Sequence, residues 1–414
     1  MNVTNEIFRV LYLSYDGMTD PLGQSQVIAY LKRLSQRGFE IDIISFEKPA
    51  IYAKKKELVA KDLQGTSITW HPLTYDNSVP VYSTWKIVQQ AYAKAEQLHK
   101  QKQFHIVHCR AQVMAIVGHR LQKEHGLKFI FDMRGWWTDE KFDSGNWNEL
   151  LFKPVYHYLK KQERKLISDS DTTITLTYAS QQEIIKLGLK NAEDIGVIPT
   201  CVDFEVFAPY KEATRQELRD KLTLPKDAKV LVHSGSIGGS YSMEDLLLVF
   251  KAFQQVFPGA YFLLLSKSSD EMELAMEKIK QSDVDPSLIR IASVDFKQVH
   301  AYLMAADYGV ILYTISYSVI GRSPTKLGEY WSSGLPVLSL KGIGDLDFIM
   351  EKYPEGGNLI QSIEMPQLVE GFRKLAAKGD KMILREAAID YFSIEKGIDF
   401  YEEVYRNLLP NKRI

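Results

Sequence analysis

Short apolar runs alternate with amphipathic helical patterns along the whole chain, and this alternation limits the possible folds more than any other feature. Apolar runs of this length are typical of strands that are buried on both faces. Helical patterns such as 24–36, 243–256, 297–305 and 325–333 lie between them. The sequence therefore predicts an α/β protein with parallel sheets covered by helices on both sides. The predicted strands are Arg9–Ser14, Ile41–Phe46, Ser67–His71, Ile106–His108, Lys128–Met133, Thr172–Thr177, Gly196–Ile198, Lys229–His233, Tyr261–Ser266, Ile289–Ala292, Tyr308–Tyr313, Pro336–Leu340 and Asn358–Ile360.

Seven strands followed by six indicate two domains, since 414 residues are too many for one hydrophobic core. Pro199 and Pro209 bracket a stretch without periodicity, which we interpret as the joint. We expect two doubly wound, Rossmann-like domains, 1–198 and 199–393, that face a cleft. In such sheets ligands bind beyond the carboxyl ends of the strands.

Composition excludes several classes of function. The net charge of −1 argues against a dedicated nucleic-acid-binding protein. Two distant cysteines predict no disulfide framework, and no apolar run is long enough for a membrane span. We therefore expect a cytoplasmic protein. Two segments are basic and aromatic, Trp85–Lys102 and Lys153–Lys165. Such helices can lie on the inner face of the cell membrane, and the alternative is that they are ordinary surface helices.

The stretch Ser323–Glu329 reads as the start of a helix that holds a phosphorylated ligand. Ser323 is a suitable N-cap, Pro324 suits the first helical position, and Gly334 followed by Pro336 ends the helix. Unpaired N–H groups and the positive end of the helix dipole favour an anion there, and Lys326 adds a full charge. Glu329 lies one turn beyond Thr325. A capped helix with a surface lysine is the alternative.

Glycine-containing loops follow the first strand of each predicted domain. Asp16, Gly23 and Gln24 lie in the first loop, and Gly235, Ser236 and Gly238 lie in the second. Neither loop contains G-x-G-x-x-G or a Walker motif, so a nicotinamide fingerprint is absent and an ATPase is disfavoured. The second loop is a plausible phosphate cradle, with Ser242 and Asp245 at capping-box spacing after it. Simple turns are the alternative.

The loop after Lys128–Met133 is rich in tryptophan and acids. Aromatic faces and carboxylates suit a sugar, which makes Trp136, Trp137, Asp139 and Glu140 candidates for acceptor binding. Arg134 could hold a phosphate through two hydrogen bonds. The structural alternative places the tryptophans in the core and Arg134 in an ion pair.

His108 and Arg110 stand near a strand end, and a structural role for His108 is equally open. The Asp-x-Asp pairs at 169/171, 283/285 and 345/347 are too short to indicate a metal site, so no metal is expected.

These motifs together resemble the GT-B glycosyltransferases of retaining family 4. The carrying segments include Tyr15–Gln26, Ile198–Asp203 and Ser323–Glu329 with Ser333–Val337. Phe131–Glu140 is similar to a phrase of a bacterial subgroup that builds surface polysaccharides. The tail from Tyr391 to Leu409 resembles the family's closing helix, so residues 394–414 should pack back on the first domain.

The resemblance implies transfer of a hexose-type sugar from a nucleotide donor, a UDP- or GDP-sugar, to a glycan or lipid-linked acceptor. Glu329 matches the second glutamate of the family's paired motif, which holds the ribose, whereas Gly321 stands where the first would be. The basic residues of the family's glycine loop are also missing, so Lys326 with Arg322 or Lys267 would replace their charge. Val294 completes the donor set, and His108, Arg134 and Lys326 are the expected catalytic residues.

Two other activities stay open on the same architecture. One is a nucleotide-sugar epimerase or phosphorylase, because a fold does not fix a function. The other is a non-catalytic subunit that binds nucleotide sugars, which is motivated by Gly321.

Overall fold

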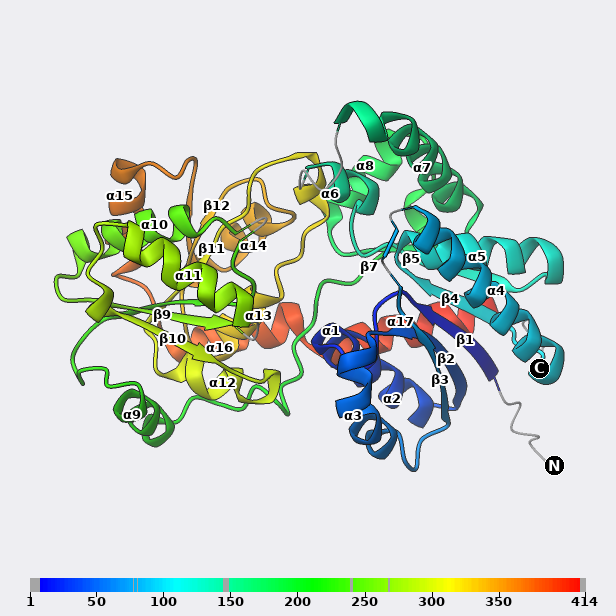
Figure 1. Ribbon diagram of the computed structural model, residues 1–414, viewed down its shortest axis with the longest axis horizontal. Coiled ribbons are helices and arrows are strands. Elements are labelled where there is room, and N and C mark those ends of the chain that lie inside the picture. Colours follow the sequence, from blue (N-terminus) through cyan, green and yellow to red (C-terminus); the bar gives the residue numbers. More distant parts are fainter. Residues whose placement is uncertain are drawn as a thin grey trace. The chain divides into compact units, whose positions relative to one another are not determined.

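The computed structural model of the chain describes residues 8–76, 78–79, 81–143, 149–238, 241–266 and 269–409. The chain divides into two compact units (Figure 1). Unit 1 comprises Met1–Pro199 together with Ile394–Ile414, and unit 2 comprises Thr200–Ser393. The divisions lie within one residue of the boundaries expected from the sequence.

Unit 1 is built on a seven-stranded parallel sheet of order β3-β2-β1-β4-β5-β6-β7. Its strands are β1 (Phe8–Ser14), β2 (Phe39–Glu47), β3 (Ile68–Thr74), β4 (Ile106–Arg110), β5 (Lys128–Asp132), β6 (Thr172–Thr175) and β7 (Ile195–Val197). Strand order reverses between β1 and β4, and this is the point at which doubly wound sheets bind ligands. Its helices are α1 (Pro21–Gly23), the π-helix η1 (Gln24–Ile28), α2 (Ala29–Gln36), α3 (Pro49–Asp62), α4 (Tyr82–Lys102), α5 (Ala111–His125), α6 (Trp137–Asp143), α7 (Glu149–Asp169), α8 (Tyr178–Lys186), the 3₁₀ turn η2 (Ala192–Asp194) and α17 (Ile394–Leu408).

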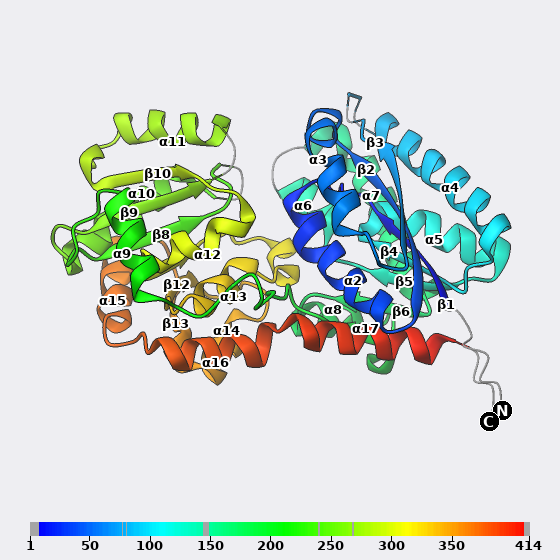
Figure 2. The ribbon, with the colours of Figure 1, turned by 90° about the horizontal axis from the view of Figure 1, so that it is seen from below.

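The C-terminal helix α17 belongs to unit 1 although the whole of unit 2 precedes it in sequence. It packs beside α2 (Figure 2). Arg37 at the end of α2 forms ion pairs with Asp399 at 2.6 Å and Glu402 at 2.7 Å. On the buried side, Phe400 lies against Gly196, where an added Cβ would come within 2.5 Å of the ring. A glycine on β7 therefore makes room for the returning helix.

Unit 2 is built on a six-stranded parallel sheet of order β10-β9-β8-β11-β12-β13. Its strands are β8 (Val230–Ser234), β9 (Tyr261–Ser266), β10 (Ile289–Ser293), β11 (Tyr308–Ile311), β12 (Val337–Leu340) and β13 (Gly357–Ile360). The order reverses between β8 and β11. The helices are α9 (Glu212–Lys221), α10 (Met243–Val256), α11 (Ser269–Gln281), η3 (Pro286–Leu288), α12 (Phe296–Met304), η4 (Tyr317–Gly321), α13 (Thr325–Ser332), α14 (Leu346–Lys352), η5 (Pro354–Gly356), α15 (Met365–Leu375) and α16 (Lys381–Phe392).

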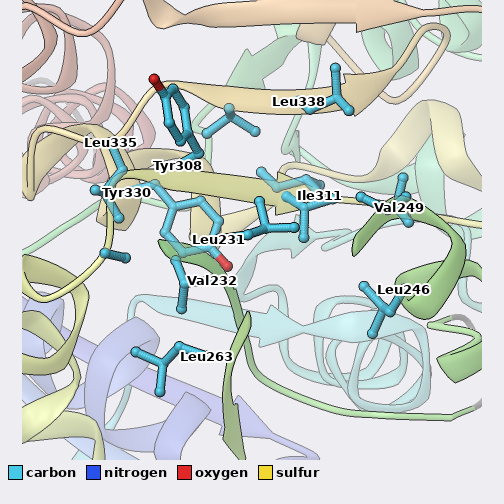
Figure 3. Close-up of a cluster of buried hydrophobic side chains, with 14 of the residues drawn as sticks. Leu231, Val232, Leu246, Val249, Leu263, Tyr308, Ile311, Tyr330, Leu335 and Leu338 are labelled. Carbon is cyan, nitrogen blue, oxygen red and sulfur yellow. The ribbon is translucent and has the colours of Figure 1, made fainter. Parts of the chain in front are cut away.

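The core of unit 2 explains why its strands read as continuous apolar runs. Side chains of β8, β9, β11 and β12 lie among those of α10 and of Tyr330 and Leu335 (Figure 3). Leu231, Leu263 and Leu338 are fully buried, and each such side chain contributes about 1.5–3 kcal/mol to folding. The predicted α/β class, with parallel sheets of seven and six strands, is confirmed. Within the described part of the chain, no helix is long and apolar enough to cross a membrane.

Candidate functional site

The helix that opens at residue 325 is held differently at its start from the prediction. Pro324, not Ser323, is the N-cap residue of α13, and no side chain caps the helix. The Ser323 hydroxyl instead accepts from the Thr200 backbone N–H at 3.1 Å, and the Thr200 hydroxyl donates to the Ser323 carbonyl at 2.7 Å. The predicted N-cap was therefore wrong because this hydroxyl ties the start of unit 2 to the helix. The predicted stripe of Leu327, Tyr330 and Trp331 is confirmed as fully buried.

Lys326 projects from the first turn of α13 toward the loop after β8. Its Nζ lies 3.7 Å from the centroid of the Tyr241 ring. The Nζ is buried, and no atom of the described residues forms a hydrogen bond with it. Burial lowers the pKa of Lys326 to about 7, although Glu329 and Glu271 act in the opposite direction. The protein thus keeps an ammonium group where its charge is poorly compensated, which is typical of an anion site.

Glu329 is the acidic counterpart one turn along the same helix. It is buried, and burial raises its pKa to about 7 against the influence of Lys326. A carboxyl group and an ammonium group are therefore both displaced from their ordinary protonation range within one turn of helix. Groups with pKa values shifted in this way by burial and by a charged partner are candidates for a functional site.

The glycine loop contributes space rather than hydrogen-bond donors. The Gly235 N–H donates to the Leu265 carbonyl at 2.8 Å, and the Gly238 N–H donates to the Tyr241 carbonyl at 2.8 Å. These two groups are therefore not available to a phosphate, contrary to the predicted cradle. Gly235 has a φ of +114°, and an added Cβ would lie 2.9 Å from the Cε of Lys326. Gly235 is thus required by the lysine that lies against it.

The remaining donor-side candidates divide into those that join this cluster and those that do not. Arg322 stacks with its Cζ 5.8 Å from the Tyr313 ring centroid, and the Tyr241 hydroxyl donates to the Tyr313 hydroxyl at 2.7 Å. Lys326 and Arg322 therefore lie over two tyrosines that are joined by a hydrogen bond. The Ser236 carbonyl accepts a hydrogen bond from the His233 Nε2 at 3.0 Å. Val294, which follows β10, and Pro324 are buried, and Thr325 is half-buried. Lys267 lies outside the described residues.

Ser242 caps α10 as predicted, since its hydroxyl accepts from the Asp245 N–H at 3.2 Å. Gly321, at the position of the missing glutamate, ends the turn η4 and is buried. Sequence reasoning missed Tyr241 and Tyr313. An aromatic residue in a loop carries no signal of the partner that it meets 72 residues later.

In unit 1, Asp16 and Arg110 form an ion pair at the carboxyl edge of the sheet, and Arg134 follows the adjacent strand β5. Arg110 ends β4, and its Nε donates to the Asp16 Oδ2 at 3.2 Å. Arg134 lies two residues after β5, and its Nη1 is 3.7 Å from the Oδ1 of the buried Asp132. Both arginines therefore lie at the carboxyl ends of adjacent strands.

His108 is a structural residue in this arrangement. It lies within β4 and is 1% exposed. Its Nδ1 shares a hydrogen bond of 2.7 Å with the Tyr405 hydroxyl of α17, and its Nε2 lies 3.5 Å from the Asp132 Oδ2. Burial lowers the pKa of His108, although Asp132 acts in the opposite direction. The predicted catalytic role is wrong, because the ring is enclosed by α17.

The tryptophan-rich loop is also engaged inside unit 1. Trp136 is fully buried and its indole N–H donates to the Ser180 hydroxyl at 3.1 Å, so neither ring face can stack on a sugar. Asp139 accepts from the Tyr156 hydroxyl at 2.8 Å and from the Lys160 ammonium at 2.6 Å. These two acceptor-binding predictions are therefore corrected to core roles. Trp137 and Glu140 remain half-buried, and residues 144–148 lie outside the described part.

The first loop places its two candidates against its own backbone. An added Cβ at Gly23 would lie 2.1 Å from the Gly17 carbonyl oxygen, so this glycine permits close packing of the loop, not close approach of a donor. The Gln24 amide donates to the Met18 carbonyl. Among the described residues there is no group of three or more His, Cys, Asp or Glu side chains that could hold a metal ion.

Comparison with known proteins agrees with this architecture. Residues 23–206 match the sequence profile of Glycosyltransferase Family 4. The family match is confined to these residues, and the chain as a whole has the GT-B fold. The sucrose-phosphate synthase of Thermosynechococcus elongatus has 16% identity and a TM-score of 0.73 over 97% of this chain and 99% of its own.

Two further solved structures are similar to this chain. HepE of Anabaena, in complex with UDP, has 16% identity and a TM-score of 0.70 over 97% of this chain and 100% of its own. WaaG, a glycosyltransferase involved in lipopolysaccharide biosynthesis, has 15% identity and a TM-score of 0.65 over 94% of this chain and 99% of its own. The comparison with curated protein sequences gave no significant match. The predicted GT-B fold is thus confirmed. Structural similarity at this level of identity does not identify the substrate of this chain.

Proposed function

We propose that this chain is a glycosyltransferase that binds a nucleoside diphosphate sugar on unit 2 and transfers the sugar, with retention of anomeric configuration, to an acceptor hydroxyl. The observation that carries the proposal is the buried Lys326 ammonium, which has no hydrogen-bond partner among the described residues. An anion at this position would supply the missing partner and offset the cost of burying the charge. HepE, a protein of the same fold, was solved with UDP and with UDP-glucose, which supports a nucleotide donor.

The two cations over the tyrosine pair suit a diphosphate leaving group. Lys326 and Arg322 would neutralise charge that builds up on the diphosphate as the glycosidic bond breaks. Protein cations in these roles make a metal ion unnecessary. Glu329 is the proposed partner of the ribose hydroxyls, since a buried carboxylate accepts strongly from hydroxyl donors.

Retention requires no protein base if an oxygen of the departing diphosphate accepts the proton of the attacking hydroxyl. The engagement of Asp139 by Tyr156 and Lys160 fits this route, because that carboxylate is occupied. We propose a glycan or lipid-linked acceptor in surface polysaccharide or glycolipid assembly, on the resemblance of Phe131–Glu140 to that subgroup.

A panel of UDP-, GDP- and dTDP-sugars tests the proposal by thermal shift, because a ligand of the folded state raises the melting temperature. We expect one nucleotide to stabilise the protein and Glu329→Ala to abolish the effect, whereas Glu370→Ala on the exposed face of α15 should retain it. NMR of the product with that donor should show the donor's anomeric configuration. Stabilisation by no nucleotide, or an inverted product, would overturn the corresponding part.

A further inference from the structure

Two arginines at the carboxyl edge of the sheet in unit 1, the buried Arg110 and the half-buried Arg134, have buried N–H groups without a partner among the described residues. The Arg110 side chain is 5% exposed and the Arg134 side chain is 9% exposed. In the described part of the chain, neither Nη1 of Arg110 nor Nε of Arg134 has a hydrogen-bond partner. Buried donors without partners each cost about 1–3 kcal/mol, so their retention needs an explanation.

The acids nearby do not saturate these guanidinium groups. The Asp16 Oδ2 accepts a hydrogen bond from the Arg110 Nε at 3.2 Å. The Asp132 Oδ1 lies 3.7 Å from the Arg134 Nη1, which is beyond hydrogen-bond distance. The Nη2 of Arg134 makes only a long contact of 3.5 Å with the Gln26 Oε1. Asp132 accepts from the Tyr401 hydroxyl at 3.0 Å through Oδ2, while its Oδ1, the atom nearest to Arg134, has no hydrogen-bond partner in the described part of the chain.

The backbone is also strained where these two arginines leave the sheet. Ala111, directly after Arg110, has a φ of +66°, and Arg134 itself has a φ of +55°. Of the three other described non-glycine residues with positive φ, Gln103 and Thr223 lie at or just after the C-terminal end of a helix, where this conformation is ordinary, and Val81 is the N-cap residue of α4. The two strained positions therefore lie at the carboxyl ends of the adjacent strands β4 and β5.

We propose that Arg110 and Arg134 form an oxyanion subsite of unit 1, and that the acceptor of the glycosyltransferase carries a phosphate or a carboxylate that binds there. Two guanidinium groups present paired N–H donors that match the oxygens of either group. This inference rests on the proposed function for its link to the acceptor, while the subsite itself rests on unit 1 alone. Asp16 is 37% exposed, so the Arg110 guanidinium lies one side chain below the surface.

Calorimetric titration of inorganic phosphate and of glucuronate tests the subsite and distinguishes the two sources of the anion. The titrations use the full chain with Lys326→Met, so that anion binding by unit 2 does not contribute. We expect one of the two probes to bind, and Arg134→Gln to weaken binding at least roughly tenfold. Arg110→Gln should act in the same way, and circular dichroism shows whether each variant is folded. The matched control is Arg120→Gln, since Arg120 lies on the exposed face of α5 and pairs with Glu124.

Binding of phosphate that is lost in the arginine variants identifies a phosphorylated acceptor, and the same result with glucuronate identifies an acidic sugar. Absence of binding by both probes, or equal binding to Arg134→Gln and Arg120→Gln, overturns the subsite. These results do not depend on the nucleotide panel. A failed panel with a positive titration would remove the proposed donor and leave the subsite in place.

Discussion

Replacing Lys326 by methionine should make the protein more stable while it removes donor binding. The pKa of Lys326 falls from 10.5 to about 7, and each pH unit corresponds to about 1.4 kcal/mol. At pH 7, where about half of these side chains are protonated, burial of the amine therefore costs the folded state about 4 kcal/mol. The pKa of about 7 already includes the attraction of Glu329, and the desolvated cation–π contact with Tyr241 returns about 2 kcal/mol. The net expectation is a gain of about 2 kcal/mol in the free energy of unfolding.

Equilibrium denaturation by urea, followed by circular dichroism at pH 7, measures this gain. For a unit of this size the same change raises the melting temperature by about 4–8 °C. Lys374→Met is the matched control, because Lys374 is exposed on α15 and should change stability by less than about 0.5 kcal/mol. A Lys326→Met protein that is less stable than the wild type, or that binds the donor equally well, would refute the reasoning.

Three further expectations follow from the two sites. Gly235→Ala should lower the free energy of unfolding by at least about 1 kcal/mol and weaken donor binding, because Gly235 has a φ of +114° and an added Cβ would meet the Lys326 Cε. An unchanged melting temperature and an unchanged donor affinity would contradict this. Tyr401→Phe should lower the free energy of unfolding by about 1–3 kcal/mol, measured by urea denaturation, because Asp132 loses its closest hydrogen-bond donor. Stability should have a minimum near pH 7. Because the pKa of Glu329 is raised, its contribution to the free energy of unfolding falls as pH rises from 4.5 to about 7. Because the pKa of Lys326 is lowered, its contribution to the free energy of unfolding increases again between about pH 7 and pH 10.5. A Lys326→Met/Glu329→Gln double variant should therefore lose the minimum when the melting temperature is measured as a function of pH.

The fold could be predicted from the sequence because it depends on local patterns. Continuous apolar runs such as β8 and β9 are legible as buried parallel strands, and the Ser242 cap and the stripe of α13 depend on spacing within a single helix. The order of strands in each sheet is then constrained by the alternation with helices.

The roles of individual site residues were less legible because they depend on distant partners. Ser323 has the chemistry of an N-cap, yet Thr200 competes for its hydroxyl from 123 residues away. Trp136 and a sugar-binding tryptophan have the same sequence signature, and only its hydrogen bond with Ser180 distinguishes them. His108 was misjudged for the same reason, since Tyr405 of the C-terminal helix encloses it.

The placement of Arg110 and Arg134 near the ends of strands, in contrast, could be predicted, because strands appear as local apolar runs. What the sequence could not predict is which of their nitrogens the protein leaves without a partner. That depends on side-chain geometry, including the 3.7 Å separation between Arg134 and Asp132.

Calorimetric titration of UDP, GDP and dTDP into the wild-type protein and Glu329→Gln tests the central claim, a nucleotide site on α13, most directly. The account predicts that one nucleoside diphosphate binds the wild type and binds Glu329→Gln at least roughly tenfold more weakly, since a charged acceptor of ribose hydroxyls is lost. Glu370→Gln, altered at an exposed carboxylate of α15, should bind like the wild type. Binding of none of the three nucleotides, or equal affinity for the wild type and Glu329→Gln, would contradict the account.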